Sequence, residues 1–332
     1  MTHPHGTTTG VLCGLLLASG LAAGPAEAAY PGDNGRIVFG RPDSGGNLQV
    51  WTARIDMTRQ RQLTSGAAGS GWATWSPRAR RIAFDSNRAD PDPGDEVGIN
   101  DVFTMRADGS GVRRVTGGDG YAGDPSWTPG GRRLLFVSDE GDYPAGQGVY
   151  SSRPDGSGLR RVTTLPAGAG SDTAPKASPD GRRIVFTRYV PTGTGEETSA
   201  LHLVDPDGSH LRRLRTTGRL RPGDADWSPD GRHLVFEAAG TRAGSRGDIF
   251  TIRRDGTRLR NLTRNETGRQ GAADPVYSPD GRRILFVSGE FPADGPPRVG
   301  LATMRPDGSH RTRLPGTPAF EDQPDWRSVG RR

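Results

Sequence analysis

The sequence predicts an all-β fold, a six-bladed β-propeller with four antiparallel strands per blade and the last blade closed by the N- and C-terminal strands. Three observations lead to this prediction: a composition rich in turn residues, a phrase that returns about every 50 residues, and incomplete units at both chain ends. The 332 residues include 50 Gly and 27 Pro, and only 32% are hydrophobic, which argues against a helical bundle. Short apolar clusters recur along the chain, which argues against disorder.

The first repeated phrase predicts the two inner strands of each blade, named strands A and B. An example is Trp227-Ser228-Pro229-Asp230-Gly231, where a strand ends at Trp and a tight turn follows. The turn is favourable because Pro presets a backbone angle, Asp bonds nearby amides and Gly tolerates positive φ. Each strand B then ends in Phe, at Phe39, Phe84, Phe136, Phe186, Phe236 and Phe286, with spacings of 45, 52, 50, 50 and 50 residues. A period of this size indicates stacked supersecondary units.

A second repeated phrase predicts the outer strands C and D. Residues 102–106 alternate apolar and polar side chains, Asp108-Gly109 supplies a turn, and an Arg-rich segment follows at residues 112–116. Counterparts occur at residues 149–163, 203–214, 249–263 and 301–314. Charge at an exposed sheet edge discourages pairing between molecules, so strand D is predicted to be outermost.

The two chain ends carry complementary halves of one blade. Strand B at Arg36 to Phe39 has no strand A before it, and strand A at Pro324-Asp325-Trp326 has no strand B after it. In a closed ring the C-terminal strand A pairs with the N-terminal strands, which completes the sixth blade and removes the open edges. A linear β-solenoid is the alternative, and it leaves these half-units unexplained.

Residues 1–28 are expected to be a secretory signal peptide, and residues 29–332 a single propeller domain. The apolar stretch from Val11 to Ala23 is too short to span a membrane and is followed by the small residues of Ala26-Glu27-Ala28, although no Lys or Arg precedes it. Cys13, the one cysteine, lies inside this stretch, so the mature chain would have no disulfide. We therefore expect a monomer that is secreted or held in the cell envelope, with no transmembrane segment after cleavage.

The charge of the chain argues against nucleic acid as a partner. Without residues 1–28 there are 44 basic and 37 acidic residues, a net charge of +7, and Lys176 is the single lysine. Nucleic-acid binding requires arginines gathered on one face with aromatic residues between them. Scattered charge on a solvated surface is the ordinary interpretation.

The strand order predicts two different faces of the propeller. The AB and CD turns, which are short and uniform, share one face, named here the turn face. The BC and DA connections, such as residues 86–101, 187–199 and 287–299, are longer and varied, and they share the opposite face, named the loop face. Variable loops on a rigid scaffold are where binding sites are usually built. Tyr143, Tyr189 and Phe291 lie in these loops and are candidates to stack on a sugar or a peptide.

Acidic residues also gather on the loop face. Asp124, Asp224, Asp274 and Asp322 come just before the Trp position of strand A, and strand A lines the central channel. One interpretation is a carboxylate ring at the channel mouth that holds a divalent cation or a cationic ligand. The other is that each Asp caps local backbone amides where the chain turns into strand A. We expect no cofactor. If these carboxylates or the acidic loop 90–96 hold a metal, calcium is the candidate.

Signatures of catalysis are mostly missing. The sequence has no Gly-x-Ser-x-Gly elbow and no His-Glu-x-x-His motif. Of the four histidines after residue 28, His210, His233 and His310 follow turns on the turn face, away from the acidic residues, so they are not expected to form a metal triad with His202. Paired carboxylates remain as candidates for acid-base chemistry.

The repeated phrase, (Trp)-Ser-Pro-Asp-Gly-x-x-Ile-x-Phe, resembles the hallmark of the TolB-type, WD-repeat-like β-propeller family. The match covers residues 34–326, with departures at Pro77-Arg78-Ala79-Arg80, which lacks Asp-Gly, and at Ala177 and Tyr277, which replace Trp. The resemblance implies the propeller fold. The motifs of the resemblance encode hairpins and blade packing. We also expect no counterpart, before Arg36, of the N-terminal α/β domain of TolB. The resemblance therefore does not carry the envelope role of TolB over to this chain.

The function expected from the sequence is binding or scaffolding. The long loops would contact a protein, a peptide or a cell-wall glycan. A metal-assisted hydrolase or a lactonase-like enzyme that uses the channel-mouth carboxylates is the alternative.

Overall fold

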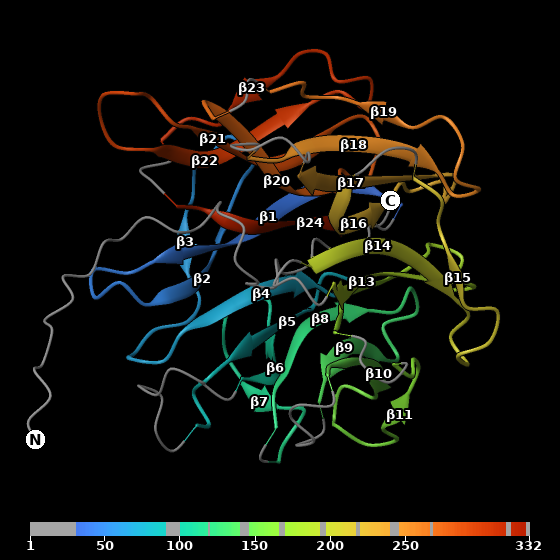
Figure 1. Ribbon diagram of the computed structural model, residues 1–332. Helices are drawn as coiled ribbons and strands as arrows, with labels where there is room; N and C mark the ends of the chain where they lie inside the picture. Colours follow the sequence, from blue (N-terminus) through green and yellow to red (C-terminus); the bar gives the residue numbers. More distant parts are fainter. Residues whose placement is uncertain are drawn as a thin grey trace, which may run out of the picture.

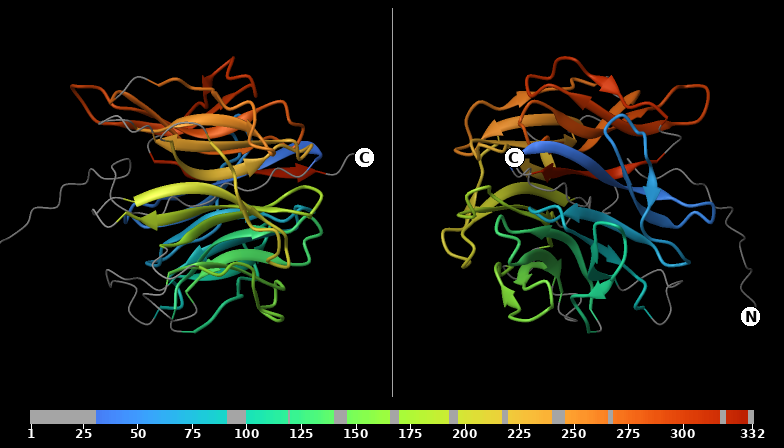
Figure 2. Two further views of the ribbon diagram at one scale, coloured as in Figure 1. Left: turned by 45° about the vertical axis from the view of Figure 1, so that its right-hand side comes forward. Right: turned by 180° about the vertical axis from the view of Figure 1, so that it is seen from behind.

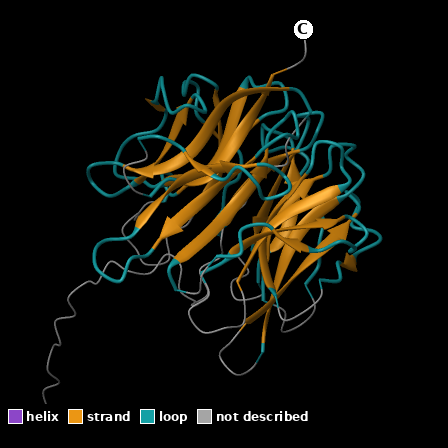
Figure 3. Cartoon of the chain, turned by 90° about the horizontal axis from the view of Figure 1, so that it is seen from above, coloured by secondary structure: helices purple, strands orange, loops and turns teal. Residues whose placement is uncertain are grey.

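Six four-stranded antiparallel sheets surround one axis in the computed structural model (Figure 1). It describes residues 31–90, 100–118, 120–139, 146–165, 170–192, 197–216, 220–239, 246–265, 268–316 and 320–329. The expected signal peptide, Tyr143 and most of the acidic loop 90–96 lie outside these ranges. The described residues contain strands and no helix (Figure 3), and so none of them forms an apolar helix able to cross a membrane.

The 24 strands fall into six blades of four. Blade 1 comprises β24 (Asp322–Val329), β1 (Asp33–Pro42), β2 (Leu48–Ala53) and β3 (Arg61–Gln62); blade 2 comprises β4 (Ser70–Trp75), β5 (Arg81–Ser86), β6 (Asp101–Arg106) and β7 (Arg113–Arg114); blade 3 comprises β8 (Ala122–Trp127), β9 (Leu134–Ser138), β10 (Gly148–Ser152) and β11 (Arg160–Arg161). Blade 4 comprises β12 (Asp172–Ala177), β13 (Ile184–Pro191), β14 (Glu197–Val204) and β15 (Arg212–Arg213); blade 5 comprises β16 (Arg221–Trp227), β17 (His233–Ala239), β18 (Asp248–Arg253) and β19 (Arg260–Asn261); blade 6 comprises β20 (Gln270–Tyr277), β21 (Ile284–Glu290), β22 (Arg298–Met304) and β23 (Thr312–Arg313).

The ring closes through the two ends of the chain, as the sequence predicts. Strand β24 pairs antiparallel with β1, with Ile37 opposite Trp326 and Val38 opposite Asp325. Figure 2 shows the red C-terminal strand beside the blue β1. Every strand A contacts the strand A of both neighbouring blades, and β24 in turn contacts β4, so the ring is complete. This excludes the solenoid alternative.

The AB turns follow the chemistry expected of them. In blade 4 the Ser178 hydroxyl donates to Asp180 at 2.6 Å, Asp180 accepts the amide of Arg182, and Gly181 has a φ of 69°. The turn of blade 2, which lacks Asp-Gly, keeps the same backbone path because Ala79 adopts a φ of 54°. The left-handed conformation is strained for an L residue other than glycine, so this turn is locally less favourable than the others.

The hydrophobic core lies between adjacent blades. The six phrase-ending Phe side chains and Trp75, Trp127 and Trp227 are all fully or almost fully buried. One cluster joins Leu201 and Leu203 of blade 4 to Trp227 and Phe236 of blade 5. A blade therefore cannot bury its apolar surface alone, and each depends on the blade beside it.

The outer edge and the two faces also agree with the sequence-based prediction. Strand D has only two residues in every blade and is the strand farthest from strand A, with exposed arginines in β7, β11 and β15. On the turn face the amide of Arg254 donates to the carbonyl of Arg232, which joins a CD turn to an AB turn. On the loop face the amide of Phe291 donates to the carbonyl of Arg269, which joins a BC loop to a DA connection.

Removal of residues 321–332 tests the closure. A chain ending at residue 320 loses β24, so that β1 keeps β2 on one edge but has no partner on its inner edge. Loss of the Trp326 side chain alone costs about 3–5 kcal/mol. We expect this chain to lose the cooperative thermal unfolding transition, measured by circular dichroism, and to associate in size-exclusion chromatography. A control chain ending at residue 329 keeps the transition. Equal melting of both truncated chains would contradict closure by β24.

Candidate functional site

Strand A carries an irregularity at the same place in nearly every blade. Three residues before the Trp position, Trp72, Asp124, Ala174, Asp274 and Gln323 have φ between 47° and 56°. The pairing of strands A and B shifts register at this point, as between Gly123 and Ser126 in blade 3. Such a bulge takes the backbone amide out of the sheet ladder, so the amide needs another acceptor.

Side chains of the preceding blade supply these acceptors. Asp124 Oδ2 accepts the amide of Ala174 at 3.1 Å, and Asp274 Oδ2 accepts the amide of Gln323 at 3.0 Å. Gln323 Oε1 in turn accepts the amide of Trp72 at 3.1 Å. Two of the predicted aspartates therefore do cap backbone amides, but the amides belong to the next blade and not to the local turn.

Two further carboxylates, which the sequence analysis did not single out, complete this set. Asp85 and Glu237 directly follow the Phe of the repeated phrase. The expectation that strand B ends at this Phe is wrong, because the pairing with strand C continues beyond it, as far as Ser86 in β5 and Ala238 in β17. Asp85 Oδ2 accepts the amide of Asp124 at 3.3 Å, and Glu237 Oε2 accepts the amide of Asp274 at 2.8 Å. Their signal in the sequence is a carboxylate at a repeat position that is Gly, Val or Thr in the other blades.

Among the described residues, the remaining two predicted aspartates do not accept an amide of the next blade. Asp224 occupies the same repeat position as Asp124, three residues before Trp227, and is fully buried beside Glu237 and Asp274. Asp322 precedes the irregular residue of its blade, and Gln323 occupies the position equivalent to Asp124. Asp322 lies opposite Gly40 on β1, where a side-chain carbon would lie 2.2 Å from its Oδ1. A glycine at this position therefore makes room for the carboxylate.

A second layer of contacts lies one residue before the Trp position. Asp226 Oδ2 accepts the amide of Tyr277 at 2.8 Å, and Asp325 Oδ2 accepts the amide of Trp75 at 2.7 Å. Lys176 occupies the same position in blade 4, and its carbonyl accepts the indole N–H of Trp227 at 3.2 Å. These bonds again join a strand A to the strand A of the next blade.

Lys176 is the single lysine of the chain, and its side chain is fully buried among these acids. Its positive charge lowers the pKa of Asp124, Asp224, Asp226 and Asp274 against the opposing effect of burial. One cation thus faces several carboxylates.

Burial dominates the ionisation of the group. It raises the pKa of Asp85 to about 8, with a further contribution from the charge of Asp124, and it raises the pKa of Asp124 to about 7. Burial and then the charge of Asp274 raise the pKa of Asp322 to about 8. Burial followed by the charge of Glu237 raises the pKa of Asp224 well above its ordinary value. Several of these groups therefore hold protons at neutral pH.

Asp124 and Asp274 accept backbone amides, whereas neither carboxylate oxygen of Asp224 accepts an amide of the described residues, and all three side chains are covered by protein. Asp124, Asp224 and Asp274 are 2%, 0% and 8% exposed. Within the described ranges, no three His, Cys, Asp or Glu side chains gather in a group that could hold a metal ion. His202 stacks on Phe186 in blade 4, whereas His210 lies in an exposed CD turn. A substrate would have to displace this packing to reach the carboxylates.

The loop face holds a more accessible candidate site. Phe291 and Pro292, with Arg269, Gln270, Glu290, Asp294, Gly295, Pro296 and Arg298, line a cavity of about 420 Å³ beside blade 6. The guanidinium of Arg246, from blade 5, lies 4.0 Å from the centre of the Phe291 ring. Tyr189 is half-buried, and its amide donates to the carbonyl of Ser171. Phe291 therefore lines this cavity, whereas Tyr189 does not.

Comparison with known proteins agrees with this architecture. The family model of the TolB beta propeller domain matches residues 19–221. An uncharacterised protein of Agrobacterium fabrum is 29% identical over 151 residues, which cover 43% of this chain and 48% of that protein, so the chain spans about half the length of this relative.

Solved structures share the fold. TolB from Acinetobacter baumannii superposes with a TM-score of 0.69 at 20% identity, over 90% of this chain and 68% of that one. An oligogalacturonate lyase in complex with manganese superposes with a TM-score of 0.55 at 15% identity, over 86% of this chain and 74% of that one. At these identities the likeness concerns the fold alone.

The raised pKa values predict that stability falls as the pH rises. An acid whose pKa is higher in the folded than in the unfolded state stabilises the fold below the unfolded value, near 4, and this contribution is lost as the pH passes the folded value, about 7 to 8 for Asp124, Asp85 and Asp322. We expect Asp224→Asn to have a larger free energy of unfolding than the wild type at pH 8, because burial raises the pKa of Asp224 and the asparagine carries no charge, and we expect a smaller difference at pH 5. Denaturant titrations at both pH values measure this. Asp207→Asn, in an exposed turn, should leave the pH dependence unchanged, and the same dependence in Asp224→Asn as in the wild type would contradict the interpretation.

Lys176→Met removes the buried cation from the same group. We expect the free energy of unfolding to fall by about 3–5 kcal/mol at pH 8, because ionised carboxylates then lack their counter-charge. The loss should be smaller at pH 5, where more of the carboxylates are protonated. Denaturant titrations again provide the measurement, and an equal loss at both pH values would mean that Lys176 acts through packing and not through its charge.

Proposed function

The chain belongs to the TolB β-propeller family, and we propose that it is an exported binding or scaffold protein whose loop face contacts a partner in the cell envelope or the medium. The proposed partner is a protein or peptide segment, with a cell-wall glycan as the second candidate. Export rests on the signal peptide expected in residues 1–28. The activity proposed here is recognition, with no bond made or broken.

The arrangement of the propeller supports a binding role. The AB and CD turns and the six blade interfaces are nearly uniform, whereas the loop-face connections differ from blade to blade in length and residue type. A rigid ring that holds variable loops can present a fixed surface without a conformational change. The burial of the channel carboxylates also disfavours the metal-assisted hydrolase or lactonase-like alternative, because a substrate could not reach Asp124 or Asp224 without unfolding strand A.

The cavity at blade 6 is the observation that carries the proposal. It combines one aromatic ring with two arginines, Arg269 and Arg298, and two acids, Glu290 and Asp294. Its volume of about 420 Å³ falls in the range of small binding pockets. Apolar contact beside groups of both charges suits the side chains of an extended peptide, and the arginines suit a carboxylate.

A double variant, Phe291→Ala with Arg298→Glu, tests this site. We expect proteins from the envelope and culture-medium fractions to be retained about tenfold less on the immobilised variant than on the wild type, which equals about 1.4 kcal/mol of binding free energy. Quantitative mass spectrometry measures the retention. Sedimentation with purified peptidoglycan forms the glycan arm.

The matched control is Arg61→Glu, a charge reversal on the exposed outer strand β3 of blade 1. It should retain the same proteins as the wild type. If the double variant binds proteins and peptidoglycan as well as the wild type does, the cavity is not the binding site. Thermal melting of all three proteins establishes that they are folded.

A further inference from the structure

The turn face carries a ring of arginines around the axis. The residue five positions after the Trp position is arginine in all five AB turns, at Arg80, Arg132, Arg182, Arg232 and Arg282, and each of these arginines is exposed. In blade 1 the two chain ends take the place of an AB turn, and Arg331, five positions after Trp326, lies outside the described residues. AB turns lie nearest the axis because strand A is the innermost strand.

The AB turns touch one another, which makes the ring continuous. A side-chain carbon placed on Gly131 would lie 3.5 Å from Pro77 of the preceding turn, and one on Gly231 would lie 3.7 Å from Pro179. The ring is completed where the amide of Gly32 donates to the carbonyl of Pro279 at 3.2 Å. The arginine that follows each turn glycine is therefore brought next to the adjacent turn.

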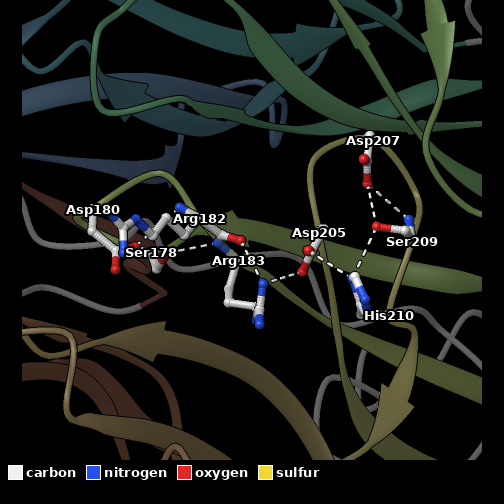
Figure 4. Close-up of polar contacts among 8 residues, drawn as sticks. All are labelled: Ser178, Asp180, Arg182, Arg183, Asp205, Asp207, Ser209 and His210. Carbon is white, nitrogen blue, oxygen red and sulfur yellow. Dashed lines mark hydrogen bonds and ion pairs between the residues drawn. The ribbon is translucent and has the colours of Figure 1, made fainter.

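These arginines are not neutralised by ion pairs. None of the five guanidinium groups has a hydrogen-bond or ion-pair partner among the described residues. Three of the AB turns contain an aspartate, and Asp180 accepts bonds from Ser178 and the amide of Arg182 (Figure 4). Asp180 also attracts the charge of Arg182, as Asp230 attracts that of Arg232 and Asp280 that of Arg282. The turns at residues 76–81, 128–133, 178–183, 228–233 and 278–283 contain ten arginines against these three aspartates, so they keep a net positive charge.

The CD turns extend the positive surface outward. Every blade adds at least one exposed arginine in or beside its CD turn, among them Arg54, Arg106, Arg153, Arg212, Arg254 and Arg305. In the CD turn of blade 4, Asp207 accepts the hydroxyl and the amide of Ser209, whereas Asp205 pairs with Arg183 of the AB turn and contacts His210 (Figure 4). The positive charge thus covers a whole face of the ring and does not follow a single groove.

Aliphatic side chains stand among these charges. Val112, Leu159 and Leu211 follow the CD turns of blades 2, 3 and 4 at equivalent positions, with exposed fractions of 39%, 51% and 43%. Each is followed directly by two exposed arginines. Of the large hydrophobic residues that are exposed in the described ranges, the only aromatic one is Phe320, and it lies on the loop face beside Val299.

We propose that the turn face docks on an anionic phospholipid bilayer. Arginines spread over a whole face match a planar layer of phosphate headgroups, and exposed Leu and Val can enter the boundary between headgroups and acyl chains. Single-stranded nucleic acid is recognised in a groove with aromatic side chains on which bases stack. The arginines do gather on one face, as nucleic-acid binding would require, but the aromatic side chains are missing from that face.

Vesicle binding by the full chain tests the proposal. Flotation is measured with vesicles of phosphatidylcholine alone and with vesicles that also contain about 30% phosphatidylglycerol, each at about 50 and about 500 mM NaCl. The two compositions and the two salt concentrations separate binding through charge from binding through apolar contact. We expect binding to the anionic vesicles only, with loss at high salt. The double variant Arg132→Glu and Arg182→Glu should bind at least about tenfold more weakly, because it reverses two charges of the ring. Leu159→Ser with Leu211→Ser should weaken binding and leave the salt dependence in place.

Arg264→Glu, in the exposed connection between β19 and β20 on the loop face, is the matched control and should bind like the wild type. Absence of binding to anionic vesicles by the wild type would overturn the proposal, as would an equal loss in Arg264→Glu and in the ring variant. Binding to soluble polyphosphate or to oligonucleotides without binding to anionic vesicles would also overturn it, in favour of a polymer as the partner. Melting temperatures within a few degrees of the wild type, about the effect of a 1 kcal/mol change, establish that each variant is folded.

Discussion

The structure depends on the pairing of the last strand with the first. Strand β24 supplies the inner strand of blade 1, and the contact is reinforced by Arg41, which donates to Glu321 at 2.7 Å beside the paired strands. A blade buries its apolar face only against its neighbours, so an open ring would leave two such faces in water. All other features, including the two distinct faces, require that this single contact be made between residues about 290 positions apart.

At the centre of the ring, buried acids accept hydrogen bonds from backbone amides. Each irregularity in strand A turns an amide toward the axis, and carboxylates of the preceding blade accept several of these amides. The cost is the desolvation of acidic groups that crowd together, which the pKa values near 7 and 8 of Asp124 and Asp85 express. Protonation at neutral pH and the charge of Lys176 offset part of that cost.

The two faces of the ring differ in chemistry because the short turns repeat from blade to blade and the long loops do not. The turn face repeats the same short turns, so an arginine that occurs once in the repeat occurs around the whole axis. The loop face has no such repetition, and its cavity is formed by the connections around blade 6 alone. Repetition favours a broad, planar contact, whereas irregular loops favour one specific ligand. The two proposals therefore concern separate surfaces of the same rigid body.

The sequence by itself determined the strands, the turns, the number of blades, the closure and the two faces. These features follow from turn chemistry and apolar patterning within about ten residues, repeated often enough to exclude alternatives. Only the tertiary structure decided which side chains meet across blades: that Asp124 caps Ala174, that Asp85, Glu237 and Lys176 join the central group, and that Gln323 and not Asp322 takes the equivalent position. Those partners lie about 40 to 50 residues apart and meet only after the ring has closed, so no local pattern encodes them.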